Sequence, residues 1–378
     1  MHCFRLLFTF VALCATVFCH EGSGLIHQGE TGSGGSVEGR RIKAALVSVL
    51  DRGAGEMYPS AVTAVKRRQD LYQLMETMRN HEDQFNRKYN YDWVIFSYEP
   101  LNETRRSMID SVASGNVHFA VIPEEQATAP EWIDQQKATD ARNEMKKKHV
   151  IYGDSVNFRD QSRFEAGFMW RHPVMDQYTY YWRVDHRDKL LCDVNYDVFK
   201  FMQDNHKQYG FMMSLYEYFE TIPTLWQSTK HFINENPQYL AQDSLADFLS
   251  DDGGQTYSKV STYGPHIASL DFWRSEAYTK YFDHLDHVGG FYYERWDRKP
   301  IQTIATSLFL NKDRVHFFDD IGVYSLPFQQ CPRDQDFRRK NRCICNPEDD
   351  FTWKGYSTVS DYYKAKGIED QIPDGVVY

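Results

Sequence analysis

Residues 180–185 read YYWRVD, a short apolar run that ends in a carboxylate. The aromatic and β-branched residues predict a buried strand with Asp185 at its carboxyl end. In an open α/β sheet, ligands bind outside the carboxyl ends of the strands. Asp188 follows three residues later, and at this spacing one carboxylate is able to hold a hard divalent cation. The alternative is a loop carboxylate that forms an ion pair with Arg183 or Arg187.

The rest of the chain supplies strands and helices in alternation around this run. Further strands are predicted at 41–50, 93–98, 117–123 and 209–216, each bounded by Asp, Gly or Pro. Apolar residues recur at helical spacing over 61–89 and over 133–145. Alternating strands and helices predict the α/β class. Residues 42–378 contain no internal linker or repeat, so we expect one large domain.

Composition narrows the classes of function. The 378 residues include 53 acidic and 43 basic side chains, for a net charge of −10, which disfavours nucleic acid as a partner. With 42% hydrophobic and 25% charged residues the chain is neither a polytopic membrane protein nor disordered. The Walker, dinucleotide-binding, HExxH and GxSxG motifs are absent from the sequence, which disfavours NTPases, zinc proteases and α/β-hydrolases.

The N-terminus has the pattern of a targeting segment. In residues 1–20, Arg5 precedes an apolar run, which predicts a secretory signal peptide or a signal anchor. Residues 21–41 are rich in Gly and Ser and predict a flexible stem. Whether the leader is cleaved stays open at this stage.

Four cysteines lie in the body of the chain, a number compatible with disulfides in an oxidising compartment. Cys343 and Cys345 are too close in sequence to bridge each other comfortably, so we expect each to pair with one of the distant residues Cys192 and Cys331. Free thiols are the alternative.

Several long motifs carry a resemblance to a known family. They include PEWIDQQKATDAR (130–142), RHPVMDQYTYYWRVD (171–185) and SLFLNKDRVHFFDDIG (307–322). In these runs, and almost throughout 130–226 and 270–332, the chain resembles the fungal Golgi α-1,2-mannosyltransferases of glycosyltransferase family 15.

The resemblance implies a fold, a reaction and a location. The fold is a mixed-sheet, nucleotide-sugar-binding (GT-A-like) single large domain. The implied reaction transfers mannose from GDP-mannose, with Mn²⁺ as cofactor and with retention, onto mannosylated glycoprotein or glycolipid acceptors. The implied location is the Golgi lumen, where the N-terminal segment, if uncleaved, anchors a type II membrane protein; secretion after signal cleavage is the alternative.

The family's functional positions carry over one by one. Asp185 takes the place of a family glutamate and is the expected metal ligand. His266 occupies the position of the proposed catalytic glutamate. The expected donor-binding residues are Arg52, Arg163, Arg183, Glu294 and Arg295.

Other positions depart from the family pattern. Arg298 replaces an aspartate, Gln302 replaces a histidine, and Ser325 replaces a histidine expected to bind manganese. A hydroxyl is a poor substitute for imidazole on a transition metal. These departures leave two alternatives to the transferase: a catalytically inactive member that binds a nucleotide-sugar or a glycan, and an enzyme of shifted specificity that uses His266 as an acid–base group.

Overall fold

The computed structural model describes residues 41–50 and 63–373. From Ile42 onward these residues group into one compact unit built around a seven-stranded sheet of order β3-β2-β1-β4-β7-β6-β8. Strands β1 to β4 pair in parallel, and β7 runs antiparallel to both β4 and β6. The strands of this sheet are β1 (Ala44–Val49), β2 (Asp92–Ser97), β3 (Val117–Val121), β4 (Tyr180–Arg183), β6 (Tyr209–Tyr216), β7 (Val260–Ser269) and β8 (Val315–Phe317).

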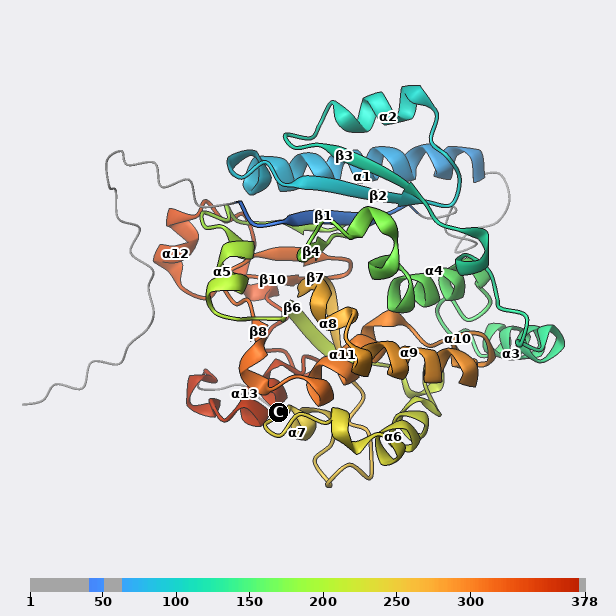
Figure 1. Cartoon of the computed structure of the whole chain (residues 1–378). Coiled ribbons are helices and arrows are strands. Elements are labelled where there is room, and N and C mark those ends of the chain that lie inside the picture. Colours follow the sequence, from blue (N-terminus) through green and yellow to red (C-terminus); the bar gives the residue numbers. More distant parts are fainter. Residues whose placement is uncertain (1–40, 51–62, 374–378) are drawn as a thin grey trace, which may run out of the picture. The chain divides into compact units, whose positions relative to one another are not determined.

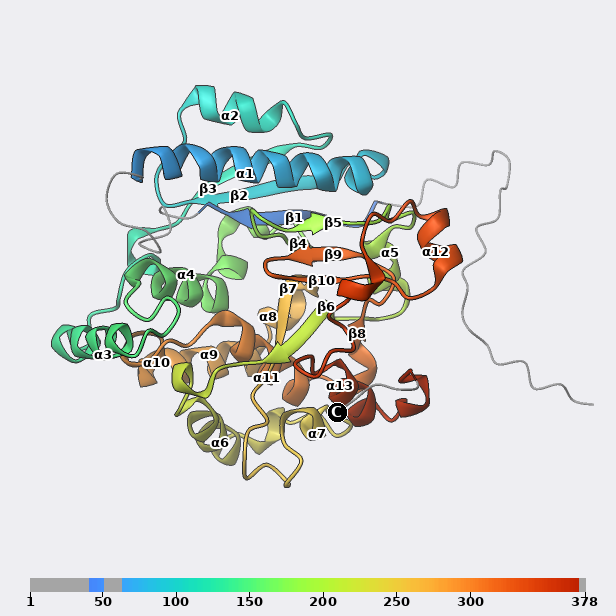
Figure 2. The same ribbon diagram turned by 180° about the vertical axis from the view of Figure 1, so that it is seen from behind.

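A small second sheet lies at the same end of the molecule as α5 and α12 (Figures 1 and 2). It has the order β10-β9-β5, with antiparallel pairing. Its strands are β5 (Lys189–Leu190), β9 (Val323–Ser325) and β10 (Phe328–Gln330).

Helices cover both faces of the main sheet (Figures 1 and 2). Successive residues of β1 point to opposite faces: Leu46 packs with Leu74 and Met78, whereas Val47 belongs to the cluster that contains Phe164 and Ile301. The sheet is therefore the middle of three layers. The helices are α1 (Thr63–Gln84), α2 (Glu103–Asp110), α3 (Gln135–Lys147), α4 (Val156–Gly167), α5 (Val198–Asp204), α6 (Leu225–Glu235), α7 (Ala246–Leu249), α8 (Leu270–Trp273), α9 (Glu276–Val288), α10 (Gly290–Tyr293), α11 (Arg298–Phe309), α12 (Gln335–Lys340) and α13 (Val359–Lys366).

The predicted α/β class and mixed sheet are confirmed. The strands predicted at 41–50, 93–98, 117–123, 180–185 and 209–216 correspond to β1, β2, β3, β4 and β6, and the two predicted helices to α1 and α3.

Sequence reasoning did not identify β7, although it joins β4 to β6 in the centre of the sheet. Gly264 has a φ of +74° and Pro265 follows it, and the pairing of β6 with β7 shifts register between Phe211 and Met213. Glycine and proline inside a strand mark such irregularities and weaken the sequence signal.

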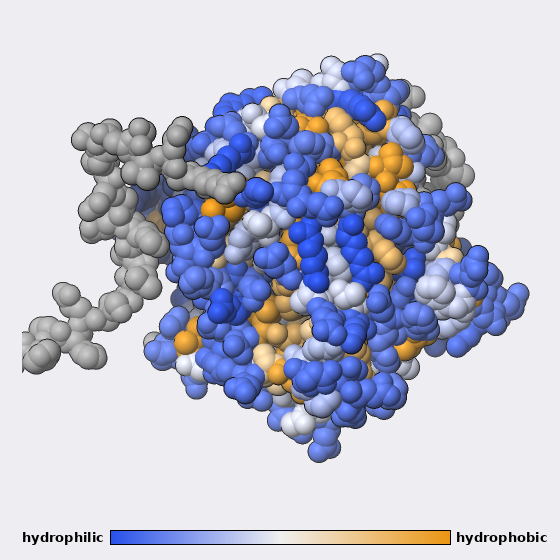
Figure 3. Space-filling view, in the orientation of Figure 1, coloured by the Kyte–Doolittle hydropathy of each residue, from blue (hydrophilic) through white to orange (hydrophobic). Residues whose placement is uncertain are grey.

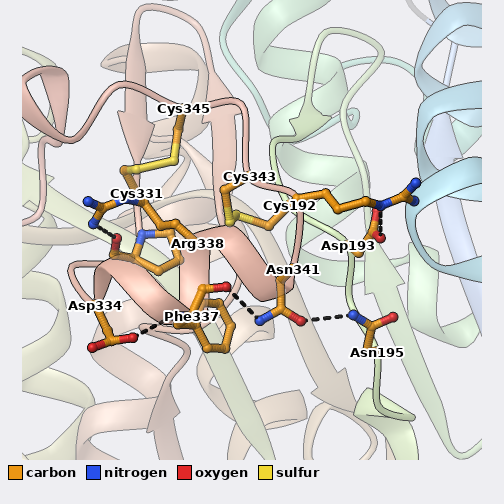
Figure 4. Close-up of a disulfide and its surroundings, with 12 residues drawn as sticks. Cys192, Asp193, Asn195, Cys331, Asp334, Phe337, Arg338, Asn341, Cys343 and Cys345 are labelled. Carbon is orange, nitrogen blue, oxygen red and sulfur yellow. Dashed lines mark hydrogen bonds and ion pairs between the residues drawn. A yellow bond between two sulfur atoms is a disulfide. The ribbon is translucent and has the colours of Figure 1, made fainter.

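Two disulfides hold the segment around α12: one joins it to the body of the molecule, and the other bridges its two ends (Figure 4). Cys192 pairs with Cys343, and Cys331 pairs with Cys345. The expectation that Cys343 and Cys345 each pair with a distant cysteine is confirmed. An amide contact of 2.8 Å between Asn195 Nδ2 and Asn341 Oδ1 lies beside the first bridge (Figure 4).

The surface is mostly polar. Hydrophilic residues predominate on the face shown in Figure 3, and hydrophobic residues appear there in small groups. Over 41–50 and 63–373, no helix combines the length and the apolar character needed to span a membrane. The predicted leader (1–20) and nearly all of the predicted stem (21–41) lie outside the described residues.

Candidate functional site

The site forms where β4 ends. The strand finishes at Arg183, and Asp185 follows it at the carboxyl edge of the sheet. Helix α11 begins at Arg298, which reaches this same edge, and Ser325 at the end of β9 hydrogen-bonds to Asp188. The fold thus places Asp185, Arg298 and Ser325 together, although they are far apart in the sequence.

Glu165 on α4 holds the two arginines of this edge. Its Oε2 lies 2.8 Å from Arg183 Nε, its Oε1 accepts a hydrogen bond of 2.9 Å from Arg183 Nη2, and Oε2 also accepts from Arg298 Nε. All three side chains are buried. Burial alone would raise the pKa of Glu165, but the charges of Arg183 and Arg298 outweigh burial and lower this pKa to about 2. Glu165 is therefore an anion that fixes both guanidinium groups.

Asp185 closes the cluster on its solvent side. Its Oδ1 lies 2.8 Å from Arg183 Nη2 and its Oδ2 lies 3.3 Å from Arg298 Nη2. The Asp185 side chain is 33% exposed, in contrast to the buried arginines. Burial opposes ionisation, but Arg183 and then Arg298 hold the pKa of Asp185 well below its usual range.

Asp188 lies beneath Asp185 and differs from it in charge state. Its Oδ2 accepts a 2.8 Å hydrogen bond from the backbone N–H of Asp185, and it also hydrogen-bonds to Ser325. Burial and the negative charge of Asp185 raise the pKa of Asp188 to about 7. Of the two carboxylates in this loop, Asp185 carries the permanent charge.

His266 lies on β7 directly opposite Arg183 on β4. The side chain is buried, and its Nε2 is 3.0 Å from the hydroxyl of Tyr181. Burial, and then the positive charges of Arg298 and Arg183, lower the pKa of His266 well below its usual value. The imidazole is therefore neutral at physiological pH, and it has a tyrosine partner.

The predicted donor-binding arginines have different surroundings. Arg183 belongs to the cluster of Glu165 and Asp185. Arg163 instead forms a buried ion pair with Asp286 on α9, with 2.7 Å between Arg163 Nε and Asp286 Oδ1. Arg52 lies outside the described residues.

Glu294 and Arg295 connect α10 to α11. Glu294 Oε1 accepts a 2.7 Å hydrogen bond from the Thr224 hydroxyl, and Oε2 accepts one of 2.6 Å from Trp296 Nε1. Arg295 Nη2 lies 3.4 Å from Glu217 Oε1, and the guanidinium carbon lies 4.8 Å from the centre of the Phe158 ring. Glu294 thus joins this connection to the start of α6, and Arg295 joins it to the end of β6.

Two acidic residues of the site were not identified from the sequence. Glu165 sits in a helix, where a carboxylate gives no signal of burial. Glu217 directly follows β6, and burial raises its pKa while the charge of Arg295 opposes that rise. The rule that singled out Asp185, a carboxylate just after a strand, would also have found Glu217.

Gln302 and Ser325, two of the positions that depart from the family pattern, are inside this region. Gln302 Nε2 donates to the backbone oxygen of Glu165 at 3.4 Å. Ser325 lies against Gly264, where an added Cβ would come within 3.1 Å of the serine Cβ. Both residues therefore support the cluster through hydrogen bonds and close packing.

The described residues around Asp185 do not fit a divalent cation held by the protein. Among the described residues, no group of three or more His, Cys, Asp or Glu side chains is arranged to hold a metal ion. Both oxygens of Asp185 face guanidinium groups, and Ser325 contributes only a hydroxyl. A transition metal favours imidazole, thiolate or unpaired carboxylate ligands. The groups that face Asp185 are thus arginine N–H donors and not further metal ligands.

A separate hollow of about 690 Å³ lies at the opposite edge of the sheet. Its lining includes Tyr180 at the start of β4, Ser269 at the end of β7, and Arg314. Ligands of open α/β sheets bind at the carboxyl ends of parallel strands, so we assign the functional site to the Asp185 edge and not to this hollow.

The fold and the site define an α/β protein that has a mixed sheet and an arginine–carboxylate cluster at the carboxyl edge of that sheet. Residues 42–367 match the family model described as glycolipid 2-alpha-mannosyltransferase, and the chain belongs to this family.

Curated relatives agree with the family assignment. The chain is 50% identical over 306 residues to "Glycolipid 2-alpha-mannosyltransferase 1" of Candida albicans, covering 81% of this chain and 71% of that protein. It is 45% identical over 315 residues to "Alpha-1,2 mannosyltransferase KTR1" of Saccharomyces cerevisiae, covering 83% of this chain and 80% of the relative.

Solved structures have the same fold. Core-mannan synthase A from Aspergillus fumigatus, in a form with Mn and GDP, matches with a TM-score of 0.77 and 30% identity, over 88% of each chain. The mannosyltransferase Ktr4p from S. cerevisiae, in complex with GDP, matches with a TM-score of 0.75 and 28% identity, over 88% of this chain and 83% of that one. The family predicted from the motifs is confirmed.

Proposed function

We propose that this chain transfers mannose from GDP-mannose to mannosylated glycoprotein or glycolipid acceptors, forming an α-1,2 linkage with retention at the anomeric carbon. The family match over 42–367 carries the proposal, since relatives matched over most of their length are named as α-1,2-mannosyltransferases. The GDP in two solved relatives supports a guanosine diphosphate sugar as the donor.

The arginines supply the electrostatic part of the reaction. Negative charge accumulates on the departing diphosphate as the bond to mannose breaks, and positioned donors that face this charge lower the barrier. Arg298 lies at the edge of the sheet beside the partly exposed Asp185. Glu165 fixes the orientation of Arg298, so the site does not have to reorganise during the reaction.

Carboxylates at this edge act on the mannose that is transferred. An oxocarbenium-like transition state needs a nearby anion or nucleophile. His266 is neutral and buried, so it does not meet that need. We assign this role to Asp297 and Glu217, which lie at the same edge of the sheet. Asp297 directly precedes Arg298 at the start of α11, and Glu217 directly follows β6.

A transfer assay tests the proposal. The purified full chain is incubated with GDP-mannose, with and without Mn²⁺, and with an α-mannoside acceptor, and the product is digested with a linkage-specific mannosidase. We expect an α-1,2-linked product, and we expect Asp185→Ala to lower the rate by about 10²-fold or more, because Asp185 helps to hold Arg183 and Arg298 in position. Asp243→Ala, which removes an exposed partner of Lys312, is the matched control and keeps the rate.

The same assay distinguishes the inactive alternative. GDP binding without transfer or hydrolysis of GDP-mannose would mean that the chain is a non-catalytic nucleotide-sugar-binding protein. A product with the inverted anomer would contradict retention.

We further propose a Golgi lumenal location with the N-terminal segment as a type II anchor. Its support is the sequence pattern of residues 1–20 together with the family, and secretion after cleavage is the competing outcome. N-terminal sequencing of the mature protein, combined with membrane fractionation, distinguishes the two.

A further inference from the structure

Both carboxylate oxygens of Asp185, the expected metal ligand, face arginine side chains. Oδ1 faces Arg183 Nη2 at 2.8 Å, and Oδ2 faces Arg298 Nη2 at 3.3 Å. A cation that bound either oxygen would have to displace a guanidinium group that is buried and held in place. Asp185 is therefore already neutralised by the protein itself.

Arg298 cannot easily move aside. Its Nε donates to Glu165, and its side chain is 6% exposed, so that leaving the cluster would strand Glu165 beside a single arginine. Breaking a buried ion pair by removing one partner is strongly unfavourable. The guanidinium of Arg298 is thus a fixed positive charge at the place where a metal ion bound to Asp185 would sit.

The charges around Asp185 are already paired without a cation. Arg183 and Arg298 balance Glu165 and Asp185. Lys299 in turn pairs with Asp297, with its Nζ 3.7 Å from Asp297 Oδ2 and 4.6 Å from the centre of the Tyr263 ring. Like charges a few ångströms apart repel strongly where water is partly excluded.

A diphosphate, in contrast, fits this arrangement. Arginine presents planar N–H donors that match phosphate oxygens. Arg298 uses Nε and Nη2 in the cluster, and no hydrogen bond joins its Nη1 to any residue within 41–50 or 63–373. The hydrogens on Nη1 are therefore not used within the described part of the chain.

We infer that this chain binds the diphosphate of its nucleotide-sugar donor without a divalent cation, with Arg298 in the place of the ion. The inference rests on the proposed function for the identity of the donor. It predicts a family member in which GDP binding is insensitive to chelators, in contrast to a site that needs Mn²⁺ to bridge Asp185 and the phosphates.

The first experiment titrates GDP into the full chain by calorimetry, once in EDTA and once in Mn²⁺. We expect the two dissociation constants to agree within about threefold, which is under the 1.4 kcal/mol that corresponds to a factor of ten. Affinity that rises about tenfold or more with Mn²⁺ would overturn the inference.

Variants connect the effect to Arg298. Arg298→Ala is expected to weaken GDP binding in EDTA by about tenfold or more, because a charge-assisted contact to phosphate is lost. It is also expected to free Asp185, so that Mn²⁺ now restores affinity and bound Mn²⁺ appears in the electron paramagnetic resonance spectrum with GDP. Asp185→Asn added to Arg298→Ala should remove that restoration. Equal behaviour of Arg298→Ala and wild type would overturn the inference.

Controls separate a binding effect from misfolding. Arg298→Lys keeps the positive charge and should retain chelator-insensitive binding if the variant folds, as judged by circular dichroism and the melting temperature. Arg339→Ala removes an exposed arginine of α12 and should leave GDP binding unchanged.

The outcomes also separate this inference from the proposed function. Chelator-insensitive GDP binding without mannose transfer contradicts the transferase and supports the role of Arg298. Transfer with Mn²⁺-dependent GDP binding contradicts only the role of Arg298. Failure to bind GDP in EDTA and also in Mn²⁺ contradicts both the role of Arg298 and the proposed function.

Discussion

The carboxylate of Glu165 on α4 accepts a hydrogen bond from the guanidinium of Arg298 at the start of α11, across 133 residues of sequence. The same carboxylate binds Arg183 at the end of β4. One buried anion therefore connects a helix, a strand and a second helix at the edge where the proposed donor binds.

Removal of the Glu165 charge should destabilise the protein. Glu165→Gln leaves two buried guanidinium groups with half of their anionic partners, and we expect a loss of about 3–5 kcal/mol in the free energy of unfolding, measured by urea denaturation. The control is Glu76→Gln, which removes an exposed partner of Lys189 and should cost less than about 1 kcal/mol. Similar losses in both variants would contradict a central structural role for Glu165.

Asp188 should make stability depend on pH in a defined direction. Its folded pKa of about 7 lies above the ordinary value of 3.8 that it has in the unfolded chain, so the folded state binds more protons between these two values. The contribution of Asp188 is fully present below about pH 4 and is lost as the pH rises through about 7.

Asp188→Asn provides the measurement. Residue 188 of this variant is never charged. The difference in stability between the variant and wild type, measured by urea denaturation, should therefore favour the variant more at about pH 8 than at about pH 5. An identical stability difference at the two pH values would show that Asp188 does not titrate in this range.

His266 should not act as an acid–base catalyst. His266→Gln preserves a polar partner for Tyr181, so we expect the transfer rate to stay within about threefold and the pH–rate profile to keep its shape, since general acid–base catalysis contributes about 10²–10⁴-fold where it operates. Loss of more than about 100-fold together with the loss of one limb of the profile would instead assign that role to His266.

The two disulfides should contribute unequally to stability. The bridge from Cys192 to Cys343 spans 151 residues, and that from Cys331 to Cys345 spans 14. In the chain-entropy model the longer loop contributes roughly 5 kcal/mol and the shorter one roughly 3 kcal/mol. Unfolding of the two double Cys→Ser variants measures the difference, and a larger loss for the shorter loop would contradict the model.

Part of the candidate site was predictable, and the limits have identifiable causes. Asp185 was recognisable because a carboxylate after a short apolar strand lies where α/β sheets bind ligands. The sequence left two roles open for Asp185, that of a metal ligand and that of an ion-pair partner. Its ion pairs with Arg183 and Arg298 show that the fold favours the second role. Strand β7, which carries His266, was not identified because Gly264 and Pro265 interrupt its pattern.

The amino-acid sequence alone determined the family, the α/β class and most strands of the sheet. It also indicated that Cys343 and Cys345 do not pair with each other but each with another cysteine. These features depend on local periodicity and on motifs that are contiguous in the chain. Only the tertiary structure decided that Glu165, Arg183, Asp185 and Arg298 form one cluster, and that Arg163 pairs with Asp286. The physical reason is that a buried charge is tolerated only beside its partner, and that partner comes from wherever the folded chain brings an opposite charge within reach.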